Sequence, residues 1–132
     1  MESSSSDASL TLDITGQLIR MSLRGELTLE RLTAAMNAVA RDQRYRHGMH
    51  AIADFRECTG HWDYSEMQRF RDYLVRIGGS RPCRWAAVVR PGRLEAVAHL
   101  VIVISEAVGA SIAMRLFDDM HSAQRWIDGE DE

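Results

Sequence analysis

The 132-residue sequence predicts a single α/β domain with a mostly parallel five-stranded sheet, in the order β-β-α-β-α-β-α-β-α. Three observations lead to this fold class. The chain opens with two alternating runs around a glycine-containing turn, which is typical of a β-hairpin. Segments with helical spacing then alternate with short apolar strands, which indicates parallel pairing through right-handed crossovers. The length is that of one domain, and hydrophobic residues make up 45% of it, so a core can form without metal or disulfide.

The predicted hairpin joins residues 10–14 to residues 19–23. Apolar side chains occupy every second position in both runs, and Thr15-Gly16-Gln17 supplies the turn. We expect the hairpin to add one antiparallel strand at an edge of the sheet. The intervening positions are polar, so one face of the sheet is expected to be thinly covered.

A helix is predicted over residues 29–41, with Thr28 as its N-cap. A third strand follows, in which Met49, Ala51, Ala53 and Phe55 alternate with His50, Ile52, Asp54 and Arg56. Asp63 and Glu66 have the spacing of a capping box. They predict the start of a second helix, which stops at Gly78-Gly79.

The second half of the chain carries two further strands. The continuous apolar run 85–89 predicts a strand buried on both faces. Residues 112–117 alternate as a fifth strand, and Asp118 or Asp119 caps a last helix that runs through Ile127.

The segment 93–108 predicts a third helix with an unusually wide apolar surface. Only Glu95, His99 and Glu106 are expected to face solvent, and Ile102 interrupts even that face. Two apolar stripes make up the rest: Leu94, Val97, Ala98, Val101, Ile104 and Val108, and beside them Ala96, Leu100, Val103 and Ala107. A second copy of the chain is the first candidate to cover this surface, a lipid-like ligand is the second, and other helices of the domain are the third.

Composition narrows the class of protein. Residues 1–7 are expected to be disordered, residues 8–128 to form the domain, and residues 129–132 to be an acidic tail. The polar, acidic start lacks the apolar region of a signal peptide, and no apolar run is long enough to span a membrane. We therefore expect a cytoplasmic chain with two reduced cysteines, Cys58 and Cys83.

The charged residues are unevenly distributed along the chain. All 16 basic residues are arginines; residues 41–93 carry eleven of them against six acidic residues, and residues 94–132 carry two against eight. The formal net charge of −3 argues against nucleic-acid binding. Codon usage in a GC-rich genome explains the absence of lysine, and an affinity of arginine for carboxylate or phosphate partners is the alternative.

The order and spacing of the elements over residues 9–128 resemble the SpoIIAA-like, or STAS, superfamily. Within it, the sequence is similar to uncharacterised bacterial members likened to CRAL-TRIO lipid-transfer domains. The resemblance is carried by Gly25-Glu26-Leu27-Thr28 after the second strand, by residues 42–48 before the third, by Asp54-Phe55-Arg56 closing the third, and by the closing helix 119–127. It implies a SpoIIAA-like fold and a role in binding or regulation.

One departure from the family bears on function. Anti-sigma-factor antagonists of this superfamily carry a phosphorylatable serine two residues after an aspartate at the end of the third strand. In this chain the triplet is Asp54-Phe55-Arg56, so the hydroxyl is missing. A phosphorylation switch at this position is therefore excluded.

Charged residues gather at the predicted carboxyl ends of the strands, where open α/β sheets usually bind ligands. These charged residues, together with the helix start near Gly92, are candidates to hold an anionic headgroup. The alternative is that their side chains form ion pairs with one another. Trp62 and Tyr64 either line a ligand mouth or form a hydrophobic staple before the second helix. The predicted ligand-binding residues are Asp54, Arg56, Trp62, Tyr64, Arg90 and Arg93.

Catalysis and metal binding are not predicted. Cys58 near His61 has no third group at a readable spacing to orient it, and His47 with His50 lacks further ligands. The sequence therefore predicts a non-enzymatic domain, without metal or cofactor, that carries or senses a small apolar or amphiphilic anionic ligand. A protein–protein regulatory module that acts on a signalling partner is the alternative, and an enzyme with an unrecognised site is the third hypothesis.

Overall fold

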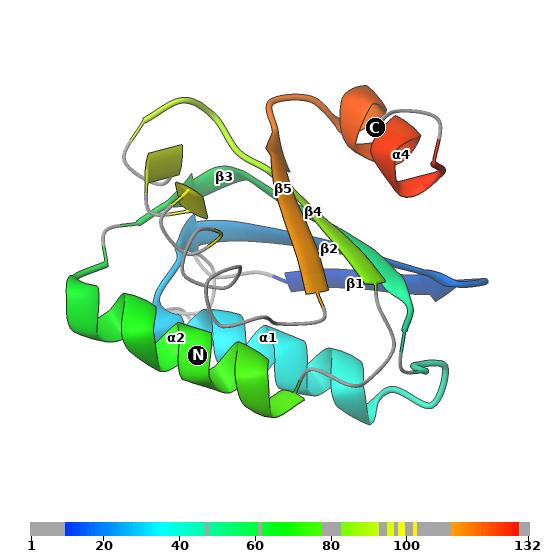
Figure 1. The fold of residues 1–132 in the computed structure, drawn as a ribbon, viewed down its shortest axis with the longest axis horizontal. Helices are drawn as coiled ribbons and strands as arrows, with labels where there is room; N and C mark the ends of the chain where they lie inside the picture. The colour runs from blue at the N-terminus through cyan, green and yellow to red at the C-terminus, as the bar shows by residue number, and fades with distance from the viewer. Residues whose placement is uncertain are drawn as a thin grey trace, which may run out of the picture.

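The structure is a computed structural model, and its described part contains a five-stranded sheet with helices on both faces (Figure 1). Helices α1 and α2 lie along one face, and the short helix α4 lies against the other (Figure 1). The residues described are 10–46, 48–60, 62–77, 83–92, 95–96, 98–99, 102 and 112–129.

The predicted hairpin is confirmed. Strand β1 (Leu10–Thr15) pairs antiparallel with β2 (Leu18–Glu26) and forms one edge of the sheet. The two-residue turn contains Gly16 at φ +63°, a left-handed conformation that glycine adopts without a steric penalty. Strand β2 continues past the predicted residues 19–23, because it bulges between Ser22 and Arg24 and keeps pairing with the next strand as far as Glu26.

Helices α1 (Leu29–Arg41) and α2 (Tyr64–Ile77) begin at the predicted caps. The Thr28 hydroxyl accepts from the Arg31 N–H at 3.1 Å. Asp63 and Glu66 each accept from the backbone N–H of the other, which completes the capping box. Both helices turn an apolar stripe toward the sheet, and its most buried members are Leu29, Leu32, Ala35, Met67, Phe70 and Leu74.

The remaining strands are parallel to β2 and follow in sequence order, β1-β2-β3-β4-β5. Strand β3 (His50–Thr59) continues past the Asp54-Phe55-Arg56 triplet that was expected to close it, because the extended β2 offers a partner as far as Thr59. Strands β4 (Cys83–Val88) and β5 (Ile112–Phe117) complete the sheet.

Part of the predicted helix 93–108 is described. Residues 95, 96, 98, 99 and 102 are helical, and the other residues of that segment, including Arg93, lie outside the described residues. His99 is exposed as expected, but Ala96, expected in an apolar stripe, is also exposed, and Ile102 is half-buried. The reason is that Ala98 and Ile102, four residues apart, share a helix face that borders the space above the sheet.

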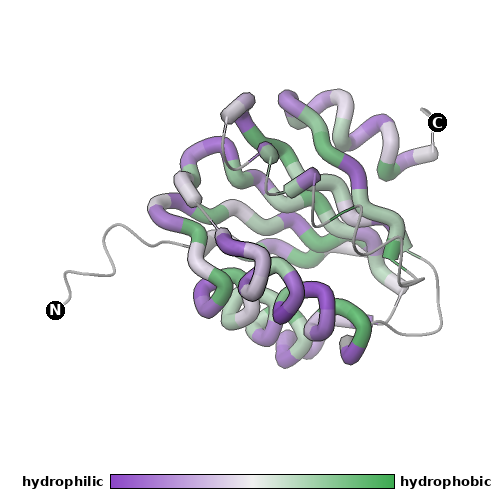
Figure 2. The backbone as a smooth tube through the Cα atoms, turned by 60° about the vertical axis from the view of Figure 1, so that its left-hand side comes forward, coloured by the Kyte–Doolittle hydropathy of each residue, from purple (hydrophilic) through white to green (hydrophobic). Residues whose placement is uncertain are grey.

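The last helix, α4 (Met120–Ile127), is capped by Asp119, whose carboxylate accepts from the Ser122 N–H at 2.7 Å. It packs against β3, β4 and β5 through a tight cluster made of Ile52, Ala86, Val88, Ala123, Trp126 and Ile127. Hydrophobic and hydrophilic residues alternate along the strands (Figure 2). Because α4 does not reach β1, Thr11 and Asp13 are exposed, as expected for a thinly covered face.

Candidate ligand-binding cavity

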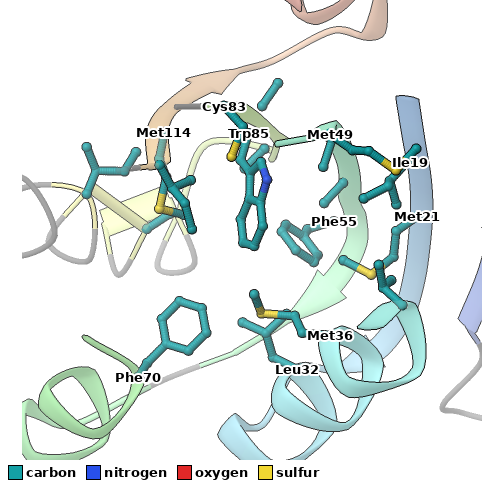
Figure 3. A pocket seen from close by; sticks show the side chains of 18 of the residues that line it. Ile19, Met21, Leu32, Met36, Met49, Phe55, Phe70, Cys83, Trp85 and Met114 are labelled. Carbon is teal, nitrogen blue, oxygen red and sulfur yellow. The ribbon is translucent and has the colours of Figure 1, made fainter. Parts of the chain in front are cut away.

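A cavity of about 530 Å³ lies between the sheet and the helices α1 and α2. This volume is within the range of small-molecule sites, roughly 300–1,000 Å³. Figure 3 shows side chains from the sheet above and from the helices below converging on this space. The cavity therefore occupies the place where an α/β domain normally has its close-packed core.

Alternate residues of the four parallel strands line the sheet side of the cavity, as the period of two along a strand requires. Three of them, Ala51, Ala53 and Ala87, are small, and register brings Ala53 beside Ala87. These alanines leave space near the centre of the sheet. The larger residues of this wall are Ile19, Met21, Phe55, Trp85, Met114 and Leu116.

The helices supply the opposite wall. Phe70 of α2 packs edge-on against Trp62 at 5.5 Å between ring centroids and stacks on Tyr73 at 6.3 Å. The Tyr73 hydroxyl donates to Asn37 Oδ1 at 2.7 Å, which links α2 to α1. The other described helix residues of this wall are Leu32, Met36, Val39, Ala40, Ala98 and Ile102.

The two faces of the sheet are packed to different extents. On the α4 face, Ile52 and Val88 are 1% and 0% exposed. On the cavity face, Phe55, Trp85 and Met114 are only partly buried although they lie beneath the helices. These three large apolar side chains border the cavity.

Polar groups are scarce in the cavity. Among the described residues that line it, Arg46 is the one with a charged side chain. The Trp62 indole N–H donates to the Leu27 carbonyl at 3.0 Å. The indole nitrogen of Trp85 is buried and has no hydrogen-bond partner among the residues that the structure describes. Figure 3 shows the Trp85 ring projecting from β4 toward the helices, with its nitrogen turned to the side of Met49.

The charged residues predicted to bind a ligand gather away from the cavity. Asp54 and Arg56 alternate with the cavity-lining Ala53 and Phe55, so they project from the opposite face of β3. Arg56 donates to both carboxylate oxygens of Asp54 at 3.0 Å, and this hydrogen bonding lowers the pKa of Asp54. Arg90 donates to the Arg56 carbonyl and to Glu57. These three predicted residues therefore form one group of mutual pairs.

The other predicted ligand-binding residues lie apart. Trp62 is buried and borders the cavity, whereas Tyr64 is 66% exposed at the start of α2. Arg93 lies outside the described residues. Of the six predicted residues, the structure places Trp62 on the cavity.

The cysteine and histidine residues named as candidates for catalysis or metal binding give little support to either function. Burial raises the pKa of the Cys58 thiol to about 11, and the nearby Arg31 offsets only part of that effect. A thiol with this pKa is almost entirely protonated at neutral pH, which disfavours nucleophilic attack. His50 Nδ1 accepts from the Arg84 backbone N–H at 2.9 Å, whereas His47 and His61 lie outside the described residues. No group of three or more His, Cys, Asp and Glu within the described ranges is placed to hold a metal ion.

Sequence reasoning missed most of the cavity lining. It placed Met49, Ala51, Ala53 and Phe55 on one face of a strand, and that face is the cavity face. The small side chains in the middle of this set were the available signal, because alanine fills a sheet–helix core poorly. Arg46 lies three residues before Met49, in the segment 42–48 that precedes the third strand, and no pattern in the sequence marks it as a lining residue.

The sequential strand order and the helix layers define a small α/β domain with a mixed sheet. No family model matches the sequence, and no curated protein does. Among solved structures, the chain is similar to an uncharacterized protein of the DUF3478 family with a SpoIIAA-like fold from Shewanella loihica PV-4. The two share 16% identity with a TM-score of 0.56, over 91% of this chain and 93% of the other. The chain therefore has the SpoIIAA-like fold, which confirms the prediction made from the sequence.

No helix in the described part of the chain is both long enough and apolar enough to cross a membrane.

Proposed function

We propose that this protein is a non-enzymatic binding domain that carries or senses a small apolar or amphiphilic ligand in the cavity between its sheet and helices α1 and α2. The observation that carries the proposal is the cavity itself, about 530 Å³, in which the described lining residues are almost all apolar. An empty space of this size forfeits dispersion contacts along its whole lining. A bound apolar ligand restores those contacts, and its own transfer from water is favourable.

The lining suits a flexible ligand. Met21, Met36, Met49 and Met114 border the cavity, and methionine adapts its shape to irregular partners. Aromatic rings from Trp62, Phe70 and Tyr73 form a further part of the wall. Such surfaces accept alkyl chains without demanding one rigid shape.

Native mass spectrometry tests the proposal. The protein is incubated with dodecanol and compared with two variants, Ala53→Phe and Ala113→Phe. Ala53 faces the cavity, so phenylalanine there fills it, whereas Ala113 is exposed on the opposite face of the sheet in β5 and serves as the matched control. We expect an adduct on the original protein and on Ala113→Phe, and its loss on Ala53→Phe. An adduct that is absent from all three, or equal in all three, would refute binding in the cavity.

The same spectra bear on the predicted homodimer. We propose that two copies of the chain contact each other through helix 93–108. Ala98 and Ile102 of that helix border the cavity. A dimer peak at low protein concentration supports this interface, and a monomer at every concentration refutes it.

A protein–protein regulatory module is the alternative, and the pairs Asp54–Arg56 and Glu57–Arg90 favour it. Both pairs lie near the carboxyl end of β3, and the second is mostly exposed, with 70% for Arg90 and 61% for Glu57. Such a group offers charges of both signs to a partner. A specific partner retained on the immobilised protein, and lost on Arg56→Glu while dodecanol still binds, would establish this function in place of the carrier role.

A further inference from the structure

The two ends of the cavity differ in polarity. Arg46 belongs to the loop that enters β3, and its carbonyl accepts from the Met49 N–H. Trp85 pairs with Ala51, the second residue of β3. Both residues therefore lie at the amino-terminal end of the parallel strands, whereas Trp62 and Val89 border the carboxyl-terminal end.

Arg46 is exposed at this end and brings a positive charge to the rim of the cavity. One terminal nitrogen of its guanidinium donates to the carbonyls of Gln43 and Tyr45, both at 2.8 Å, which holds the group in place. Its other two nitrogens have no acceptor among the described residues. The described lining contains no acidic side chain to balance the charge. An anion is the complement of such a site, because a guanidinium binds carboxylate oxygens with charge-assisted hydrogen bonds.

The Trp85 indole adds a second polar group without a hydrogen-bond partner in the described part of the chain, near the same end of the cavity. Its nitrogen is buried without a hydrogen-bond partner, and an unpaired buried donor is unfavourable. Cys83 precedes Trp85 by two residues, and an interaction with the indole N–H partly offsets the burial that raises the pKa of its thiol. This contact falls short of hydrogen-bond geometry, so a ligand carboxylate oxygen is the kind of acceptor that the indole N–H lacks.

The opposite end of the cavity is apolar, and its indole N–H group is already hydrogen-bonded within the protein. The Trp62 N–H is already bonded to the Leu27 carbonyl, so this indole presents carbon atoms to the cavity. Phe70 packs against Trp62, and Phe55 lies on the same side of the sheet. This end suits a hydrocarbon tail.

We infer that the ligand is a long-chain carboxylate that binds with its headgroup beside Arg46 and its tail toward Trp62 and Phe70. The inference rests on the proposed function and adds to it the charge of the ligand and its direction in the cavity. It also locates the headgroup at the amino-terminal end of β3 and β4, away from the charged pairs near the carboxyl ends.

The charge is tested with three probes of equal chain length: dodecanoate, dodecanol and dodecylamine. Binding is followed by isothermal titration to the original protein, to Arg46→Gln and to Arg41→Gln. Arg41 is exposed at the end of α1 and does not border the cavity, so it is the matched control. We expect dodecanoate to bind best and dodecylamine worst. Arg46→Gln should weaken dodecanoate by roughly threefold to tenfold, leave dodecanol unchanged, and make the carboxylate less sensitive to salt.

The direction is tested by tryptophan quenching with brominated dodecanoates in the Trp85→Phe variant. There Trp62 is the tryptophan on the cavity, and Trp126 packs on the other face of the sheet as a constant background. Bromine at the tail end should quench more strongly than bromine next to the carboxylate. The reverse order would overturn the proposed direction, whatever the affinity of the variant.

The outcomes separate the two proposals. If none of the three dodecyl probes binds, the carrier function itself fails. If all three bind equally, or if Arg46→Gln and Arg41→Gln have the same effect on dodecanoate, the cavity binds ligands but the inferred carboxylate is wrong.

Discussion

Two adjacent alanines of β4 provide a direct test of the cavity, because their side chains face opposite ways. Ala87 faces the cavity beside Ala53. Ala86 also borders the cavity, but its side chain is 2% exposed and packs with Val88 and Trp126 beneath α4. The same substitution, alanine to isoleucine, should therefore have opposite effects on stability at the two positions.

The magnitudes follow from what the added atoms meet. Isoleucine adds three carbon atoms, and burying them in the cavity contributes about 0.8 kcal/mol each. Ordering the longer side chain costs roughly 0.5–1 kcal/mol. Ala87→Ile should therefore raise the free energy of unfolding by about 1–2 kcal/mol. Ala86→Ile pushes the same atoms into a filled cluster and should lower it by about 1–3 kcal/mol.

The assay is equilibrium unfolding in urea followed by circular dichroism, with the free energy extrapolated to water for both variants. The difference between them should be at least about 2 kcal/mol, with similar dependence on urea. If Ala87→Ile destabilises the protein as much as Ala86→Ile does, the space above Ala87 is filled by protein. That result would refute the cavity and the carrier function together.

Three further predictions test the surroundings of the cavity. Trp62→Phe removes the indole donor of the Leu27 carbonyl, and should cost about 1–3 kcal/mol of stability in urea unfolding. Asp63→Ala breaks the capping box with Glu66 and should cost about 1 kcal/mol, most of which Asp63→Asn recovers; unchanged thermal unfolding of Asp63→Ala would contradict the role of this cap. Because burial raises the pKa of Cys58 to about 11, iodoacetamide at pH 8 should alkylate it about a hundredfold more slowly than free cysteine, and the rate should rise up to about pH 11. A rate equal to that of the urea-unfolded chain, measured by peptide mass spectrometry, would show that the thiol is not shielded.

Local features of the fold were predictable because short-range chemistry determines them. Thr28 caps α1, and Asp63 with Glu66 caps α2, as their spacing indicated. Gly16 forms the hairpin turn between two alternating runs. Each of these depends on residues no more than four positions apart, so the sequence contains all the necessary information.

The cavity was not predictable in the same way. An alternating strand such as Met49, Ala51, Ala53 and Phe55 shows which side chains face the helices. It does not show how far away the helices lie, and a packed core would have the same pattern. That spacing depends on the combined volumes of α1, α2 and several strands, which are distant in sequence.

The expected position of the ligand depended on a rule for doubly wound sheets. In those sheets the strand order reverses, and a crevice opens outside the carboxyl ends at the reversal. The described sheet has no reversal, since its strands follow one another from β1 to β5. The crossover helices α1 and α2 consequently lie on one face (Figure 1). Space for a ligand arises beneath these helices, while Asp54, Arg56 and Arg90 pair with each other near the strand ends.

The same strand order has a consequence for how the protein acquires its structure. Every strand pairs with the one made immediately before it, so no later strand has to be inserted between two earlier ones. Contacts that are close in sequence form quickly, since little loop entropy is lost in closing them. The sheet can therefore grow from the hairpin outward as the chain leaves the ribosome, with β5 and α4 added last.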